Sequence, residues 1–252
     1  MNKAKNIIIA GPCAAESMEL IVESAKQAKK RKVDFLRVSL FKPRTKPGFE
    51  GVGEDGIDFL IAAAKLGVNP ATEVLFPDQA KRIMDKVFTA VPETKLLLWI
   101  GSRNQHHVIQ RETAKIIASD KRAYLLVKNQ PWKNKKHWEG IAEHALEGEI
   151  DRDHLYMCHR GFAPHGYENP YEMRNIPDFE MSMEIREETK LPMIFDPSHI
   201  GGTVENVLRI AKESKKYEFD GLMVEVHMDP KNAMTDAEQQ LTWEQFDELV
   251  KK

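Results

Sequence analysis

Short apolar runs recur along this chain, and each is separated from the next by a polar, amphipathic segment. The runs are nearly continuous rather than alternating, which is typical of parallel strands covered on both faces. The segments between them place apolar residues three and four positions apart, as amphipathic helices do. This regular alternation predicts a series of βαβ units. The runs span residues 6–11, 33–41, 69–75, 96–101, 123–128, 154–160, 192–196 and 221–226.

The number of these units and the chain length together predict one fold. An open, doubly wound sheet also alternates strands and helices, but eight similar units favour a closed barrel. The 252 residues are close to the roughly 250 typical of such barrels, and they can bury one large core. We therefore expect residues 1–252 to form a single (β/α)8 TIM barrel without a separate regulatory domain.

Composition excludes several classes of partner. The net charge of -2 is dispersed, so no large field attracts nucleic acid or anionic lipid. The apolar run near the N-terminus is too short for a signal peptide, and no stretch approaches the roughly 20 apolar residues of a membrane span. Two cysteines, Cys13 and Cys158, argue against a disulfide framework. The sequence predicts a cytoplasmic protein.

Polar and charged motifs occupy the carboxyl ends of the predicted strands. In a (β/α)8 barrel all these ends meet at one mouth, so residues far apart in sequence lie close together. Singly, each motif has an ordinary explanation, because a lone cysteine often packs as a small apolar side chain and a lone lysine is usually solvated. Together they favour a shared site. In chain order the motifs are GPCAAES, KPRTKPGFEG, TEV, GSRN, VKN, CHRG, DPSH and EVH.

Six of these mouth residues are cations, and such a group requires an anionic ligand that carries several charges. Two anion sites are predicted. Arg44 and Thr45, in a loop bracketed by prolines, can bind one phosphate. Arg103, Lys128 and Arg160, on neighbouring strands, can enclose a second anion, and the other two cations lie between the sites. The six cations are Arg37, Lys42, Arg44, Arg103, Lys128 and Arg160.

Four further mouth residues form a candidate metal site: Cys13, His199, Glu225 and Asp236. A thiolate, an imidazole and two carboxylates suit borderline metals such as Mn, Fe, Co or Zn. The cysteine could instead be packed, and the aspartate could cap a helix. We favour a metal because all four residues project from the same end of the barrel. His227 is a candidate to support a ligand or contact a substrate.

The remaining features of the sequence are less specific. The segment 161–179, rich in proline, glycine and aromatic residues, is predicted to be a mouth loop or lid. Five other histidines have no identifiable partners and are interpreted as surface or packing residues. They are His106, His107, His137, His144 and His165.

Taken in order from Asn6 to Thr242, the motifs resemble one enzyme family. GPCAAES, LRVSLFKPRTKPGFEGVG, TEV, GSRN, VKN, HRG, DPSHIGG and EVHMDPKNAMTDAEQQLT are similar to those of the 3-deoxy-D-arabino-heptulosonate 7-phosphate (DAHP) synthases, in particular the barrel-only microbial type. The resemblance implies a metal-dependent condensation of phosphoenolpyruvate with erythrose 4-phosphate that releases inorganic phosphate. This reaction is the first step of the shikimate pathway to chorismate and the aromatic amino acids.

The resemblance also implies a role for each motif. The metal ligands would be Cys13, His199, Glu225 and Asp236. Phosphoenolpyruvate would be held by Arg37, Lys42, Gly101, Ser102, Arg103, Lys128 and Arg160. Erythrose 4-phosphate would be held by Pro43, Arg44 and Thr45. Lys42, Glu73 and His199 would be catalytic, with Lys42 as proton donor to the aldehyde oxygen and Glu73 orienting the water.

The chain departs from the family pattern in two places. GSRN replaces the commoner GAR, and the segment before Lys42 lacks the paired glycines found in relatives. By resemblance we expect a homo-oligomer, dimer or tetramer, and a separate chorismate mutase is a candidate partner chain. We also expect phenylalanine, tyrosine and tryptophan not to inhibit the chain when it is assayed alone.

Three alternatives remain. The first is the sister enzyme that uses arabinose 5-phosphate to make 3-deoxy-D-manno-octulosonate 8-phosphate, although KPRT in place of its Asn-Arg loop favours the shorter sugar. The second is a Schiff-base aldolase with Lys128 as nucleophile. The third is a non-catalytic homologue that binds phosphoenolpyruvate or serves as a partner subunit.

Overall fold

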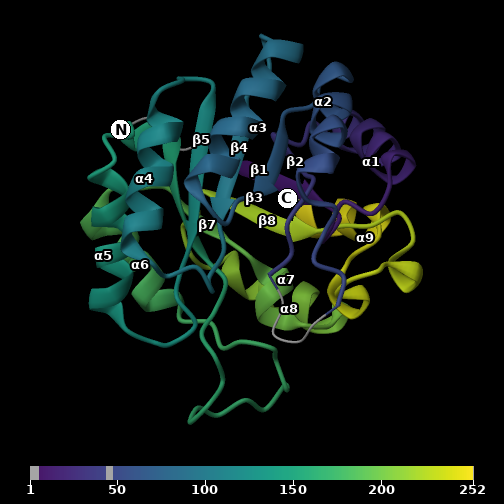
Figure 1. Cartoon of the computed structure of the whole chain (residues 1–252). Helices are drawn as coiled ribbons and strands as arrows, with labels where there is room; N and C mark the ends of the chain where they lie inside the picture. Colours follow the sequence, from purple (N-terminus) through teal and green to yellow (C-terminus); the bar gives the residue numbers. More distant parts are fainter. Residues whose placement is uncertain (1–5, 44–47, 252) are drawn as a thin grey trace.

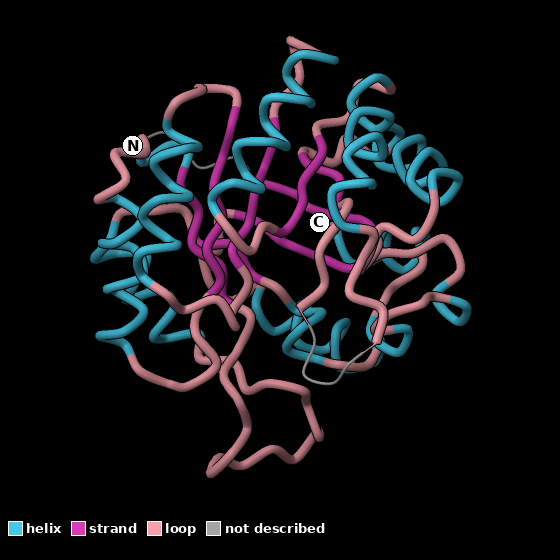
Figure 2. The backbone as a smooth tube through the Cα atoms, viewed as in Figure 1, coloured by secondary structure: helices cyan, strands magenta, loops and turns pink. Residues whose placement is uncertain are grey.

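The computed structural model describes residues 6–43 and 48–251. Within these residues, parallel strands form a closed barrel in which β8 pairs with β1. Figure 2 shows the strands at the centre of the molecule with helices around them. The predicted (β/α)8 barrel is thus confirmed. The strands are β1 (Ile7–Gly11), β2 (Phe35–Arg37), β3 (Pro70–Glu73), β4 (Leu96–Ile100), β5 (Ala123–Lys128), β6 (Leu155–His159), β7 (Met193–Phe195) and β8 (Gly221–Glu225).

Helices connect successive strands and cover the outside of the barrel (Figure 1). Several begin at a side chain that accepts a backbone hydrogen bond from the first turn, as Ser17, Asp178 and Thr203 do. Such caps satisfy amide groups that the helix itself leaves free. The α-helices are α1 (Met18–Lys30), α2 (Ile57–Lys65), α3 (Pro77–Ala90), α4 (His107–Ala118), α5 (Lys135–Leu146), α6 (Phe179–Thr189), α7 (Pro197–Gly201), α8 (Val204–Ser214) and α9 (Trp243–Val250).

Short 3-10 helices interrupt the connecting loops, and the last of them lies in the mouth loop after β8. They are η1 (Gly53–Gly56), η2 (Arg152–His154), η3 (Pro230–Asn232) and η4 (Ala237–Gln239). None of the helices in the described ranges has the length and apolar character needed to cross a membrane.

The apolar residues of the strands divide between two packed layers, because successive side chains on a strand point to opposite faces. In β4, Leu97 and Trp99 belong to the cluster that fills the barrel, whereas Leu98 and Ile100 pack in the layer beneath the helices. The barrel interior is thus filled by packed side chains. Its buried residues are Ile9, Phe35, Ala71, Leu97, Trp99, Leu126, Tyr156, Cys158, Ile194 and Met223.

The same alternation determines which residues reach the mouth. Two residues beyond an interior side chain, the next inward position falls at the carboxyl end of its strand or just after it. On every strand this position is a glycine or a charged residue. These positions are Gly11, Arg37, Glu73, Gly101, Lys128, Arg160, Asp196 and Glu225.

The second strand is much shorter than the run 33–41 predicts. Strand β2 ends at Arg37, and the buried residues after it leave the barrel. The amide of Leu40 donates to Thr72 Oγ1, and the amide of Lys42 donates to the carbonyl of Glu50, so this segment bonds to neighbouring loops. Residues that are buried without sheet pairing show the same apolar pattern as a strand, which explains why the sequence predicts a strand as far as residue 41.

Candidate active site

Side chains from several strand ends surround a small cavity at the mouth. It is lined by Lys42, Pro43, Glu73, Trp99, Gly101, Ser102, Arg103, Lys128, Arg160 and His199. The structure therefore brings together most of the residues predicted to bind phosphoenolpyruvate; Arg37 does not line the cavity but packs against Trp99, which does. Arg44 and Thr45, predicted for the second phosphate, lie outside the described residues.

The cations on the β5 and β6 side of the cavity are deeply buried. Lys128 Nζ lies 2.7 Å from Asp196 Oδ2. Arg160 donates through Nη1 to Asn175 Oδ1 at 2.8 Å, and its Nε has no hydrogen-bond partner in the described part of the chain. Burial lowers the pKa of Arg160 to about 10, and the nearby charges of Arg174 and Arg103 act in the same direction. A guanidinium with an unused donor at a cavity wall is suited to bind an anion.

A second buried ion pair lies against Trp99 of the cavity lining. Arg37 donates through Nη2 to Glu225 Oε1 at 2.8 Å, and both charged side chains are almost inaccessible to solvent. The centre of the Trp99 ring lies 5.1 Å from the guanidinium carbon of Arg37. Arg37 Nη1 has no partner among the described residues. The prediction that a ligand must balance all the cations is thus wrong in part, because Glu225 and Asp196 already balance Arg37 and Lys128.

Three of the predicted metal ligands form a compact cluster beside this cavity. One ligand atom from each of Cys13, Glu225 and Asp236 lies within 4.8 Å of the others. The thiol of Cys13 donates to Asp236 Oδ2 at 3.1 Å. Lys42 Nζ lies 2.7 Å from Cys13 Sγ and 3.3 Å from Asp236 Oδ2. The Lys42 ammonium therefore reaches both the cluster and the cavity.

The fourth predicted ligand, His199, faces the same cluster. Its Nε2 is 3.6 Å from Glu225 Oε1, and its Nδ1 is 2.9 Å from Asp196 Oδ2. A carboxylate bound to one ring nitrogen fixes the ring and leaves the other nitrogen available to a metal. Burial lowers the pKa of His199 to about 4, although the charge of Asp196 opposes this shift. A neutral imidazole is the form that binds metals.

The charges of the cluster fit a divalent cation. Burial raises the pKa of the Cys13 thiol, and the neighbouring carboxylate of Glu225 adds to this effect. Burial also raises the pKa of Glu225, but His199, Arg37 and Lys42 outweigh it and hold the value at about 2. The donor set of one sulfur, one nitrogen and two carboxylates, with the carboxylates ionised, suits Mn, Fe, Co or Zn.

Asp236 occupies the N-cap position of η4, but its side chain makes no capping hydrogen bond there. The carboxylate contacts Cys13 and Lys42 instead, so the helix-cap alternative does not hold. Its backbone is left-handed, with φ of 47°. Residues other than glycine are uncommon in this region, and such strain often accompanies a functional role.

Glu73, at the carboxyl end of β3, also lines the cavity. Burial raises the pKa of its carboxyl group, while Lys42 and Lys128 oppose the shift. A Cβ at Gly101 would overlap Glu73 Oε1, so glycine at this position leaves the space that the carboxylate occupies. In the GSRN motif, Gly101 therefore leaves space for Glu73, and Arg103 supplies the positive charge.

Sequence reasoning missed several residues that hold the site together. Asp196 lies within the DPSH motif, where no sequence pattern indicates its role, and it pairs with Lys128 and His199. Gln239 donates to Glu225 Oε2, and Gln240 accepts from the amide of Cys13. The only sequence signal was their position inside motifs at strand ends or in mouth loops.

His227 of the EVH motif and the histidines outside the motifs do not line the cavity. His227 is buried with Nε2 3.7 Å from Glu16 Oε2, and its Nδ1 accepts from the amide of Asp229. The rings of His106, His107 and His144 pack against one another near the start of α4.

Comparisons with known proteins agree with this geometry. The sequence matches the model of the DAHP synthetase I family over residues 2–252. It is 32% identical over 251 residues to a phospho-2-dehydro-3-deoxyheptonate aldolase of Thermotoga maritima, covering 97% of this chain and 68% of the relative. A 2-dehydro-3-deoxyphosphooctonate aldolase of Stenotrophomonas maltophilia is 26% identical over 266 residues, covering 96% of this chain and 88% of the relative.

Solved structures give the same result. The fold is similar to a crystal structure of the Thermotoga maritima DAHP synthase, with a TM-score of 0.84 and 30% identity over 98% of this chain and 68% of that one. A truncated form of the Thermotoga maritima enzyme gives a TM-score of 0.81 at 28% identity, covering 98% of this chain and 84% of that one. This chain belongs to the DAHP synthetase I family.

Proposed function

We propose that this protein condenses phosphoenolpyruvate with erythrose 4-phosphate to form DAHP and inorganic phosphate. The observation that carries the proposal is the position of Lys42. Its ammonium touches Cys13 and Asp236 on one side and lines the cationic cavity on the other. An aldehyde at the ligand cluster and an enol phosphate in the cavity would therefore meet beside one proton donor.

The cavity provides the binding site for phosphoenolpyruvate. Arg37, Lys128 and Arg160 would hold its phosphate and carboxylate, together with Ser102 and Arg103, which also line the cavity. Because these cations are already fixed by buried partners, little reorganisation accompanies binding. A divalent metal held by the predicted ligands would polarise the aldehyde oxygen.

Lys42 and Glu73 would act on the reacting atoms. Burial lowers the pKa of Lys42, but Cys13, Glu225 and Asp236 raise it by more, so the group stays protonated and can donate. As the third carbon of phosphoenolpyruvate bonds to the aldehyde carbon, Lys42 gives a proton to the aldehyde oxygen. Glu73 orients a water that adds to the second carbon, and the resulting hemiketal loses phosphate to give the ketone.

For erythrose 4-phosphate, we propose that Pro43, Arg44 and Thr45 hold the terminal phosphate. Pro43 lies at the rim, where its carbonyl accepts a hydrogen bond from Arg103 at 3.2 Å. The relative that shares 32% identity is named for the heptonate product, whereas the phosphooctonate relatives are about 26% identical. This difference supports the four-carbon sugar over arabinose 5-phosphate.

The buried pairing of Lys128 argues against a Schiff-base aldolase. Lys128 Nζ lies 2.7 Å from the fully buried Asp196 carboxylate, so the amine is engaged in an ion pair rather than presented to a carbonyl carbon. Borohydride trapping should therefore leave Lys128 unmodified.

Turnover with a panel of metals and both aldose phosphates tests the proposal. The enzyme stripped of metal should release phosphate with erythrose 4-phosphate only after a divalent ion is restored. Faster release with arabinose 5-phosphate would show that the second substrate is wrong, and no release with either sugar would favour the non-catalytic alternative.

Cys13→Ala tests the ligand cluster directly. The variant should fold but bind metal at least about tenfold more weakly, because it lacks the sulfur ligand. Cys158→Ala is the matched control, since Cys158 is equally buried but belongs to the barrel core. Equal metal content in both purified variants would contradict the four-ligand assignment.

We further propose that the chain forms a homo-oligomer, dimer or tetramer. Phe76, Trp132, Tyr171 and Met234 are all about half exposed and follow the carboxyl ends of strands. Large exposed apolar side chains at one end of a molecule are typical of interaction sites. Light scattering coupled to gel filtration would measure the mass, and a monomer at micromolar concentration would refute this proposal.

A further inference from the structure

The loop between β6 and α6 returns to the mouth at two adjacent residues. Figure 1 shows its middle part projecting away from the barrel. The amide of Arg174 donates to the carbonyl of Gly201, and the amide of Asn175 donates to the carbonyl of Ile200. The backbone of both residues is therefore tied to α7, which also carries His199.

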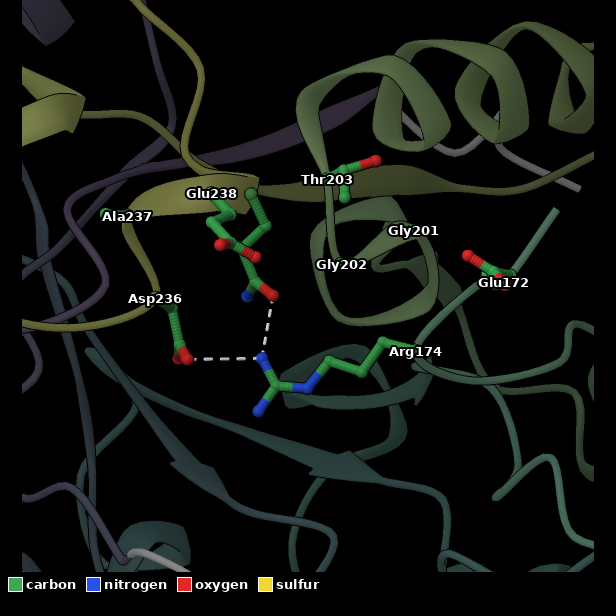
Figure 3. Close-up of a pocket in the computed structure, with 9 residues that line it drawn as sticks. Glu172, Arg174, Gly201, Gly202, Thr203, Asp236, Ala237 and Glu238 are labelled. Atoms are coloured by element: carbon green, nitrogen blue, oxygen red, sulfur yellow. Dashed lines mark hydrogen bonds and ion pairs between the residues drawn. The ribbon is translucent and has the colours of Figure 1, made fainter.

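Arg174 contacts the ligand cluster from outside. Its Nη1 lies 3.2 Å from Asp236 Oδ1 and 2.7 Å from Gln239 Oε1 (Figure 3). Gln239 in turn donates to Glu225 Oε2 at 2.5 Å. Because Arg174 binds one oxygen of Asp236, the other oxygen, Oδ2, remains directed at Cys13. One guanidinium nitrogen thus orients both carboxylates of the cluster.

Asn175 makes the corresponding contacts on the cavity side. It is 6% exposed, and its Oδ1 accepts from Arg160 Nη1 at 2.8 Å. Its Nδ2 donates to the backbone carbonyl of His199 at 2.6 Å. Only a side chain with both an acceptor and a donor can make this pair of contacts, and a primary amide provides both. Asn175 therefore fixes the guanidinium that lines the cavity.

We propose that Arg174 and Asn175 are positioning residues that hold the two halves of the active site from one loop. Arg174 orients the metal-binding carboxylates, and Asn175 orients the arginine that binds phosphoenolpyruvate. Neither side chain touches the reacting atoms. The inference rests on the proposed function for the identity of the two ligands, but the contacts themselves do not depend on it.

The proposal predicts that substitutions at these neighbouring positions weaken different ligands. Arg174→Gln should weaken Mn²⁺ binding about tenfold, since groups that orient metal ligands typically have effects of this size. Arg174→Lys should recover much of this loss, because a single nitrogen makes both contacts. The affinity for phosphoenolpyruvate without metal should change less than about twofold.

At the second position, Asn175→Ala should weaken phosphoenolpyruvate binding about tenfold, as expected when a hydrogen bond to a charged group is removed. Mn²⁺ affinity should be nearly unchanged. If the alanine variant does not fold, Asn175→Ser is measured in the same way. Arg209→Gln is the control, because Arg209 of α8 stacks on Tyr171 of the same loop at 4.0 Å and pairs with the exposed Glu205, and neither contact involves the ligand cluster or the cavity.

Titration calorimetry with phosphoenolpyruvate and competition with a chelator for Mn²⁺ measure both affinities on the whole chain. The proposal is overturned if Arg174→Gln leaves Mn²⁺ affinity within about twofold of the wild type. It is also overturned if both variants lose both affinities equally, since that indicates general disruption of the loop. If the two variants show this division of affinities but the wild-type protein makes no DAHP, the proposed function alone is refuted.

Discussion

The buried pair of Lys128 and Asp196 gives the most quantitative prediction. Both side chains are at most 5% exposed, and their charged atoms are 2.7 Å apart. Removing one partner of a buried pair costs about 3–5 kcal/mol, because the other charge is left in a medium of low polarity. Asp196→Asn preserves the size of the side chain but removes its charge. We expect it to lower the free energy of unfolding by about 4 kcal/mol.

The companion variant Lys128→Met should cost about 3 kcal/mol, since Asp196 keeps its contact with His199. Additive effects would give about 7 kcal/mol for the double variant. Removing both charges together should instead cost only about 3 kcal/mol. The coupling energy should therefore be about 4 kcal/mol, above the roughly 0.5–3 kcal/mol usual for residues in contact, because this pair is fully buried. At about 2–4 °C per kcal/mol, Asp196→Asn should melt about 8–16 °C below the wild type.

Urea denaturation of the four proteins with a chelator present measures this cycle. The chelator matters because bound metal would stabilise the native state and mask the differences. A loss below about 1 kcal/mol for Asp196→Asn, or strict additivity in the double variant, would refute the reasoning. Either result would mean that water or structural relaxation already screens this pair.

Two further predictions concern the cavity wall and pH. Gly101→Ala should lower kcat/KM about 100-fold, because the added Cβ would displace Glu73. Gly140→Ala is the control: its Cβ would meet nothing within 4 Å, so it should stabilise α5 by about 0.5–1 kcal/mol. Equal values of kcat/KM in the two variants would contradict the prediction. Burial lowers the pKa of His159 to about 3, against about 6.5 in an unfolded chain. His159 therefore binds a proton in the unfolded state but not in the folded state at pH values between about 3 and 6.5, and the free energy of unfolding falls as pH drops through this range. At pH 5 the loss from His159 should be about 2 kcal/mol. A His159→Gln variant with the same pH slope would show that other groups cause the loss.

The strand order and the composition of the mouth could be predicted from sequence because both follow from local patterns. An inward core residue such as Trp99 or Leu126 fixes the direction of the residue two positions later. Closure of the barrel then brings those positions together. Cys13 and Asp236 could thus be placed in one site although nearly the whole chain separates them.

The partners of these residues could not be predicted in the same way. Asp196 neutralises Lys128, and Arg174 binds Asp236, through loop conformations that no periodic pattern specifies. The end of β2 was also missed, because residues 38–41 are buried against loops and read like a strand. Ion pairing and loop burial depend on the three-dimensional approach of segments, which a single sequence does not encode locally.

The left-handed backbone of Asp236 restricts which substitutions this position can tolerate. Asparagine shares the ability of aspartate to adopt that conformation, whereas β-branched and bulky residues do so only with strain. In a saturation library, asparagine should therefore be the variant that preserves folding while it removes the charge. Valine or isoleucine should reduce the yield of folded protein. The backbone geometry thus limits which substitutions are tolerated at Asp236, independently of what its carboxylate binds.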